Sequence, residues 1–293
     1  QDSKDQQFYM AAGNRVDLLV KAPLLPAIYP VLVQHAVGPS DPDTAYPVPL
    51  VSVRIKAGQQ QVTGKPSEFI DKAPTPPKFL DDITDTEVQG TTRELDFLSN
   101  PAGFPSSHTI NGKKFDGYEN AQEVFLNTVE EWKIVNSTLG ISHPFHIHVN
   151  PFQLVELFNP SETVPNPKNA KKPLPKYIFY PSSDLAPGQC ILNPNDPSSW
   201  KPCGASAPGP RIWWDVFPIP SAAIATDELG KPIPGPPDKD GKPTQIVVPG
   251  YFKMRSRFVD YPGYYVLHCH ILAHEDRGMM ATVEVTLSKE KAA

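Results

Sequence analysis

The sequence predicts an all-β protein, in which short strands joined by long loops form a sandwich or a barrel. Prolines number 36 among the 293 residues, more than twice the usual frequency of about 5%, and proline disrupts both helix interiors and central strands. No helical 3.6-residue periodicity extends over a useful length, whereas several short runs alternate apolar and polar residues and end at turn signals. Short strands at these spacings are typical of sandwiches and barrels.

Composition narrows the class of protein further. The chain is 39% hydrophobic and 10% aromatic, which is typical of a folded domain and not of a disordered segment. No apolar run reaches the ~20 residues that a membrane span needs. Lysine and arginine number 27 against 32 aspartates and glutamates, a net charge of −5. We therefore expect neither a nucleic acid nor a membrane as a partner.

Three parts follow one another along the chain. Residues 1–55 contain candidate strands at 15–21 and 29–35, which are too few to form a domain of their own. Residues 56–92 are proline-rich with little periodicity, and we expect a linker there. Residues 93–288 hold a run of strands and form the main predicted domain.

Within this main domain, each predicted strand is rich in branched or aromatic residues. In order, they are 95–98, 108–115, 123–126, 130–136, 145–158, 251–258, 263–271 and 281–287. Asn111-Gly112 marks a hairpin turn within the second of them. A long proline-rich excursion, residues 159–249, separates the fifth from the sixth.

Histidines gather in two short windows of the predicted strands. Of eight histidines in the chain, six lie in these windows together with one cysteine: His143, His146, His148, His268, Cys269, His270 and His274. A single histidine on a strand is usually a core or surface residue, but a cluster of this size with a thiol predicts metal binding.

The spacing of these residues predicts two metal sites on one strand. Successive side chains of a strand point to opposite faces, so His268 and His270 share a face and Cys269 points the other way. His146 and His148 likewise share a face. A thiol on one side and imidazoles on the other, one residue apart, would suit electron transfer between two sites.

The chemistry of the ligands indicates copper. A thiolate, two imidazoles and a weak thioether describe a blue-copper site, and Cys269, His143, His274 and Met279 supply this set. Zinc would gain nothing from the thioether. The remaining four histidines form an all-imidazole set, which suits further copper ions.

These motifs resemble those of a known family. The segments HPFHIHVNPFQ and GYYVLHCHILAHEDRGMM resemble the C-terminal copper motifs of the multicopper oxidases, the laccase family, and the likeness extends back over roughly residues 93–288. It implies a cupredoxin-like Greek-key β-barrel or sandwich, with the end of a second cupredoxin domain at the N-terminus. It also implies an oxidase that couples one-electron oxidation of phenolic or aromatic substrates at a type 1 copper to four-electron reduction of dioxygen to water at a trinuclear cluster.

The resemblance implies a role for each ligand in an enzyme with four copper ions. His143, Cys269 and His274 match type 1 ligands, with Met279 axial; His146 matches the type 2 ligand; His148, His268 and His270 match ligands of the paired type 3 ions. His274 also matches the ligand whose ring edge admits electrons from the substrate. Glu275 matches a carboxylate implicated in proton supply, which is chemically sensible, although a solvated acidic residue is the alternative.

The chain departs from the family in one large respect. The trinuclear cluster takes eight histidines, and this chain offers four. The others would lie in two His-x-His motifs, whereas residues 1–140 contain only His35 and His108, which we expect to be structural. Residues 1–55 resemble the last strands of a middle domain. We therefore expect this chain to be the C-terminal part of a larger enzyme, working with a second chain or N-terminal fragment, with dioxygen and with a small aromatic reductant.

Two further expectations concern location and an alternative function. Cys190 and Cys203 lie in one loop-like stretch, where a disulfide would suit a secreted or periplasmic protein; two unrelated thiols are the alternative. The functional alternative to an oxidase is a blue-copper electron-transfer module or a non-catalytic copper-binding module. The four surplus histidines favour the oxidase.

Overall fold

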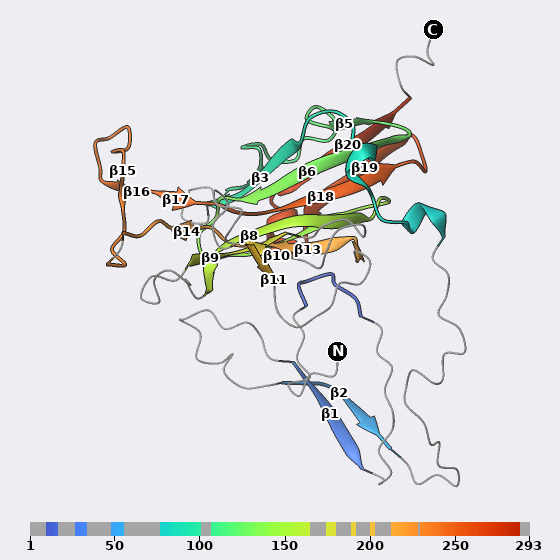
Figure 1. Ribbon diagram of the computed structural model, residues 1–293, viewed down its shortest axis with the longest axis horizontal. Helices are drawn as coiled ribbons and strands as arrows, with labels where there is room; N and C mark the ends of the chain where they lie inside the picture. The colour runs from blue at the N-terminus through green and yellow to red at the C-terminus, as the bar shows by residue number, and fades with distance from the viewer. Residues whose placement is uncertain are drawn as a thin grey trace. The chain divides into compact units, whose positions relative to one another are not determined.

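The protein is described by a computed structural model covering residues 10–16, 27–33, 48–55, 77–100, 107–164, 174–179, 189–191, 200–202, 212–227 and 229–287. These residues are almost all strands and their connections (Figure 1), which confirms the predicted all-β class. No helix among them is long and apolar enough to cross a membrane. Contacts divide the chain into two compact units, residues 16–76 and residues 1–15 with 77–293.

The smaller unit contains one antiparallel strand pair. Strand β1 (Ile28–Val33) pairs with β2 (Val48–Arg54), with a shift of register between Val31 and Leu32. The predicted strand at 29–35 corresponds to β1, whereas most of the predicted strand at 15–21 lies outside the described residues. The assignment of residues 1–55 to a middle cupredoxin domain stays a prediction.

The larger unit has two main sheets. Within the described residues the first sheet has nine strands, with β12 paired beside β8. In spatial order they are β11 (Trp200–Pro202), β10 (Gln189–Ile191), β9 (Leu174–Phe179), β8 (Phe152–Val164), β18 (Gly250–Phe258), β6 (Thr128–Asn136), β3 (Arg93–Asn100) and β4 (Ser107–Ile110), with β12 (Trp213–Trp214) off this path.

The second main sheet has five described strands and carries the histidine windows. In spatial order they are β13 (Val216–Ile219), β7 (His143–Ile147), β19 (Gly263–Cys269), β20 (Met280–Thr286) and β5 (Gln122–Phe125). The remaining elements are short: β14 (Ala223–Ile224) pairs with β17 (Val247–Val248), β15 (Pro234–Gly235) with β16 (Thr244–Gln245), and the helical turns are η3 (Lys78–Leu80), η4 (Asp85–Glu87) and α1 (Leu272–Glu275).

The core of this unit consists of apolar side chains from both main sheets. Its largest fully buried residues include Trp132, Phe97, Phe145, Phe152 and Phe252. Phe152 stacks on Phe252 with ring centroids 5.9 Å apart, and Phe145 packs edge-on against both. Each such side chain contributes about 1.5–3 kcal/mol by leaving water. The same cluster includes Cys269 and Met279, two residues of the predicted copper site.

The Asn111-Gly112 turn forms as predicted. Both residues have positive φ, 52° and 75°, as a tight hairpin turn of this dipeptide requires. The strand after the turn is reduced to a single bridge between Ile110 and Lys113, so the predicted strand 108–115 ends at 110.

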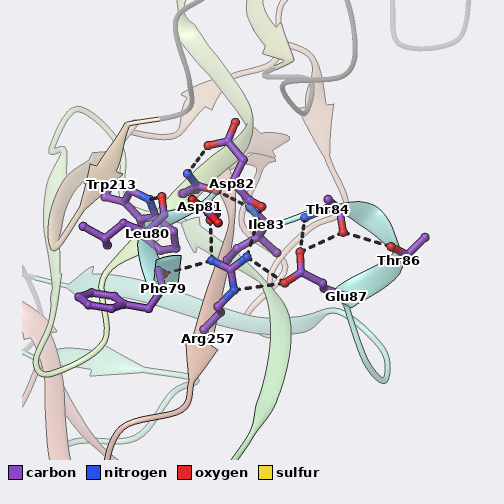
Figure 2. Close-up of polar contacts among 11 residues, drawn as sticks. Phe79, Leu80, Asp81, Asp82, Ile83, Thr84, Thr86, Glu87, Trp213 and Arg257 are labelled. Carbon is purple, nitrogen blue, oxygen red and sulfur yellow. Dashed lines mark hydrogen bonds and ion pairs between the residues drawn. The ribbon is translucent and has the colours of Figure 1, made fainter. Parts of the chain in front are cut away.

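Residues 77–92, expected to lie within a linker, are packed onto the first sheet (Figure 2). Arg257 donates to three backbone carbonyls of this segment and to Glu87 Oε1 at 2.8 Å. Ile83 is fully buried, and its N–H donates to Gln153 Oε1 at 2.9 Å. The segment lacks periodicity because side chains from distant strands, and not a regular ladder, satisfy its backbone. The expected boundaries at 55 and 92 thus differ from the division at 76, and the domain assignment itself stays a prediction.

Candidate metal centres

One candidate site is formed by a thiol and two imidazoles that converge from three elements. Cys269 ends β19, His143 begins β7 and His274 lies on α1. Cys269 Sγ lies 3.5 Å from His143 Nδ1 and 3.7 Å from His274 Nδ1, and the two Nδ1 atoms are 3.3 Å apart. With Met279, these residues are called the cysteine pocket below. The ligand atoms of Cys269, His143 and His274 lie within 4.8 Å of one another, as a metal site requires.

The cysteine pocket is enclosed by the core. His143, Cys269 and Met279 are each 0% exposed, and His274 is partly exposed. Met279 is held against two of the others by its backbone, because its N–H donates to His274 O at 3.0 Å and its carbonyl accepts from Cys269 N at 3.0 Å. These backbone bonds keep Met279 next to the other residues of the pocket, and its role as the axial ligand stays a prediction.

Burial determines the protonation of these ligands when no metal is present. It lowers the pKa of His143 to about 3, with the nearby His274 and His108 rings adding to the effect. It lowers the pKa of His274 to about 4 and raises the pKa of the Cys269 thiol to about 12. Both imidazoles are therefore neutral at physiological pH and ready to ligate, whereas the thiol gives up its proton only when a metal replaces it.

The register of β7 against β19 places a second candidate site on the opposite face. His268 pairs directly with His146, and Cys269 pairs with Phe145. Directly paired residues share a face of the sheet, and neighbouring residues along a strand alternate. The two imidazoles therefore face away from the core, whereas Cys269 and Phe145 face into it. This is the arrangement that alternation along the sequence predicted.

Four imidazoles gather on that outer face. His148 Nε2 lies 3.3 Å from His268 Nε2, and these two histidines and His146 bring one ring nitrogen each within 4.8 Å of the others. The ring of His270 lies 5.5 Å from that of His146 and 5.3 Å from that of His268, between centroids. These four residues are called the imidazole cluster. His268 is 4% exposed, and the other three are partly or fully open to solvent.

Contacts made by the Nδ1 atoms orient two rings of the imidazole cluster. His146 Nδ1 donates to Asp215 O at 2.8 Å, and His268 Nδ1 donates to Cys269 O at 3.2 Å. Glu275 Oε2, which is buried and accepts no hydrogen bond within the described part of the chain, lies 3.1 Å from His268 Nδ1. Such contacts leave Nε2 free for a metal and are typical of metal-ligating histidines. The Glu275 side chain is partly exposed, and its buried oxygen Oε2 is turned toward the cluster.

A segment near the N-terminus contacts the imidazole cluster, and the sequence did not predict this contact. Residues 10–15 belong to the larger unit, and Asn14 Nδ2 donates to Val216 O at 2.8 Å. Gly13 has φ +83°, and a Cβ added to it would lie 2.5 Å from His270 Cδ2. Only glycine fits this approach. No local pattern links residue 13 to residue 270, so the sequence offered no signal.

His108, which the sequence analysis expects to be structural, packs against a residue of the cysteine pocket. It is 3% exposed and its ring stacks on that of His274, with centroids 4.2 Å apart. Ser99 Oγ lies 2.9 Å from its Nδ1. His35 and Cys203 lie outside the described residues, and so does the predicted Cys190–Cys203 disulfide.

The residues present fit copper. One thiol, two neutral imidazoles and a buried methionine beside them are the donors of a blue-copper site, and the all-imidazole set suits further copper ions. The same donors fit zinc poorly, because zinc does not use a thioether. This donor chemistry fits a copper-binding protein, and the fold that presents it is all-β.

Comparisons with known proteins place the chain in a family. It matches the family model described as "Multicopper oxidase" over residues 77–180 and 239–289, more than half of its length. The laccase of Bacillus stratosphericus is 26% identical over 160 residues, 55% of this chain and 21% of the relative. The multicopper oxidase mco of Staphylococcus aureus is 27% identical over 199 residues, 67% of this chain and 28% of the relative. The chain belongs to the multicopper oxidase family.

A solved structure and the lengths of the relatives complete the comparison. A laccase-like multi-copper oxidase from Ochrobactrum sp. matches 89% of this chain and 42% of its own, at 17% identity and a TM-score of 0.45. The chain spans between 21% and 28% of the length of the two relatives above.

Proposed function

We propose that this chain is the C-terminal part of a multicopper oxidase. The complete enzyme would couple one-electron oxidation of phenolic or aromatic substrates at a type 1 copper to four-electron reduction of dioxygen to water at a trinuclear cluster. One observation carries the proposal: Cys269 faces the core pocket while its neighbours His268 and His270 lie in the imidazole cluster on the other face. A path of covalent bonds within one strand therefore joins two metal sites.

Copper in both sites would supply one-electron redox chemistry. Within the cysteine pocket, His143 and His274 would ligate as neutral imidazoles and Cys269 as a thiolate, with Met279 as the weak axial donor. Nδ1 of His274 faces Cys269 Sγ, so the opposite edge of this partly exposed ring is available to a small aromatic reductant. The burial of the other three residues would keep water away from a metal bound there.

The imidazole cluster would hold the type 2 ion through His146 and the type 3 pair through His148, His268 and His270. Four imidazoles are half of the set that three ions need, which supports a second chain or N-terminal fragment as the source of two His-x-His motifs. Glu275, whose buried Oε2 lies 3.1 Å from His268 Nδ1, would hold a proton beside the site. The predicted loop disulfide would favour a secreted or periplasmic location.

Oxygen consumption tests the proposal. The chain, copper-loaded together with the part that carries the other His-x-His motifs, should oxidise four equivalents of a phenolic reductant for each dioxygen consumed and release no hydrogen peroxide. Native mass spectrometry should show the two parts in one complex. A monodisperse 32.3 kDa species that binds four copper ions and reduces dioxygen alone would contradict the need for a partner.

A blue-copper electron-transfer module is the second candidate. It is favoured by one observation, that this chain alone supplies every residue of the cysteine pocket but only part of a trinuclear site. A blue protein that exchanges electrons with small redox dyes, and consumes no dioxygen even with its complementary part, would establish this alternative.

A further inference from the structure

The outer nitrogen of His143 is tied into a buried polar network. Its Nε2 lies 3.0 Å from Thr138 Oγ1 and 3.4 Å from Ser99 Oγ. Because Nδ1 faces Cys269 Sγ, Nε2 carries the proton when Nδ1 ligates and donates it to these hydroxyls. The Ser99 N–H also donates to Thr138 Oγ1 at 2.8 Å. This network holds the plane of the His143 ring.

His108 joins that network to the second imidazole of the pocket. It lies on β4 directly opposite Ser99 of β3, and its Nδ1 is 2.9 Å from Ser99 Oγ. Its ring covers one face of the His274 ring, with an interplanar angle of 19° and centroids 4.2 Å apart. One buried ring thus contacts one ligand directly and reaches the other, His143, through a single hydroxyl.

His274 is the ligand with the weakest support from the sheet. His143 and Cys269 lie on paired strands, whereas His274 lies on the single turn α1, where the neighbouring Leu272 is 66% exposed. The χ2 angle of a histidine is intrinsically broad. A ring stacked against it restricts this rotation, so His108 supplies the rigidity that the short helix does not.

We infer that His108, acting with Ser99, is a positioning residue of the cysteine pocket: it holds the rings of His274 and His143 in their ligating orientations and thereby sets the redox potential of the bound copper. This inference rests on the proposed function, since it requires copper in the pocket. Contacts behind the ligands tune a metal site by about 10–100-fold. If the two imidazoles were held less firmly, bound Cu(II) would relax toward the tetragonal geometry that it prefers. This relaxation would stabilise Cu(II) relative to Cu(I) and so lower the redox potential.

Three variants of the copper-loaded enzyme separate the two contacts of His108. His108→Ala removes both the stacked ring and the hydrogen bond, His108→Phe keeps a flat ring without the hydrogen bond, and Ser99→Ala keeps the ring but breaks its connection to His143. Ser256→Ala is the matched control, because Ser256, like Ser99, is a buried serine of the same sheet, and its hydroxyl donates to Pro151 O. The readouts are the visible charge-transfer band, the copper hyperfine coupling in electron paramagnetic resonance, and the potential.

His108→Ala should shift the Cu(II)/Cu(I) equilibrium about tenfold toward Cu(II), or about 59 mV for a one-electron couple, with a broadened band and an altered hyperfine coupling. His108→Phe and Ser99→Ala each remove only part of these contacts and should therefore shift the equilibrium less, by about threefold, below the ~10–100-fold typical of losing a whole outer contact. Ser256→Ala should match the wild type. If His108→Ala does not fold, the two milder variants carry the test.

The outcomes distinguish the inference from the proposed function. A wild type that binds copper without a blue band would overturn both. A blue wild type whose folded variants keep the same band, hyperfine coupling and potential would overturn the role of His108 alone. Equal shifts in Ser99→Ala and Ser256→Ala would also overturn it, because the effect would then be a general one of losing a buried hydroxyl.

Discussion

The cysteine pocket and the imidazole cluster share strand β19 but differ in how they are enclosed. Three residues of the pocket are 0% exposed and pack within the apolar core of this chain. In the cluster, His148 is exposed, and His146 and His270 are partly so. Core packing of this chain therefore encloses the cysteine pocket, whereas the imidazole cluster stays open on its outer face. An enclosed site is preorganised by this chain, and an open one leaves room for further ligands.

The largest expected effect is that of removing the thiol. Cys269→Ser should abolish the intense visible absorption and the oxidase activity of the assembled enzyme, because only the thiolate supplies the charge-transfer band and the connection between the sites. Copper bound by the imidazole cluster should stay. Absorption spectra and copper content measure both sites at once. A blue band that persists in this variant would contradict the assignment of Cys269.

Gly13→Ala should disturb the opposite site. An added Cβ would lie 2.5 Å from the His270 ring at a φ of +83°, and misplacing a ligand by about 1 Å can reduce a rate 100-fold. We expect at least a tenfold loss of oxygen consumption with copper lost from the imidazole cluster and an unchanged blue band.

Gly90→Ala is the matched control for this substitution. Gly90 has φ +75° with nothing within 4 Å of an added Cβ, so it carries the same backbone strain without the contact. Equal losses in both variants would show that strain, and not the contact with His270, is responsible.

Acid should destabilise the metal-free protein chiefly through the enclosed site. The pKa of His143 is about 3 in the folded chain and about 6.5 in an unfolded one. Between these values the unfolded state binds a proton that the native state does not, so the free energy of unfolding falls as pH falls, by about 1.4 kcal/mol per pH unit. Urea unfolding at pH 7.5, 6 and 5 measures this slope.

Two variants compare the sites in the same experiment. His143→Gln should flatten the dependence of stability on pH, because it removes the buried ring. His148→Gln should flatten it less, because His148 is exposed. A larger effect from His148→Gln would reverse our interpretation of which site is enclosed.

The smallest expected effect is that of the axial ligand. Met279→Leu replaces a fully buried thioether by an apolar side chain of similar volume, which cores tolerate well. The blue band should persist, and the potential should rise, because loss of a weak donor destabilises Cu(II) more than Cu(I). Redox titration measures the potential. An unchanged or lowered potential would indicate that Met280, or no methionine, is axial.

Local rules were sufficient for the main features of both sites. The alternation of side chains along a strand placed Cys269 opposite His268 and His270 before any tertiary contact was known, and the pairing of β7 with β19 agrees with it. The proline excess and the absence of helical periodicity were sufficient for the all-β class. Residues 77–92 escaped prediction, because Arg257 and Gln153 hold them through contacts across 70 or more positions of the chain.

The sequence by itself determined the class of fold and which residues to expect as two sets of copper ligands, because strand periodicity and donor chemistry are properties of short segments. Only the tertiary structure decided which site is enclosed and which residues contact the ligand rings from outside the site. The stack of His108 on His274 and the approach of Gly13 to His270 join residues far apart in the chain. No local period connects such residues; the packing of the two sheets and of residues 10–15 brings them together.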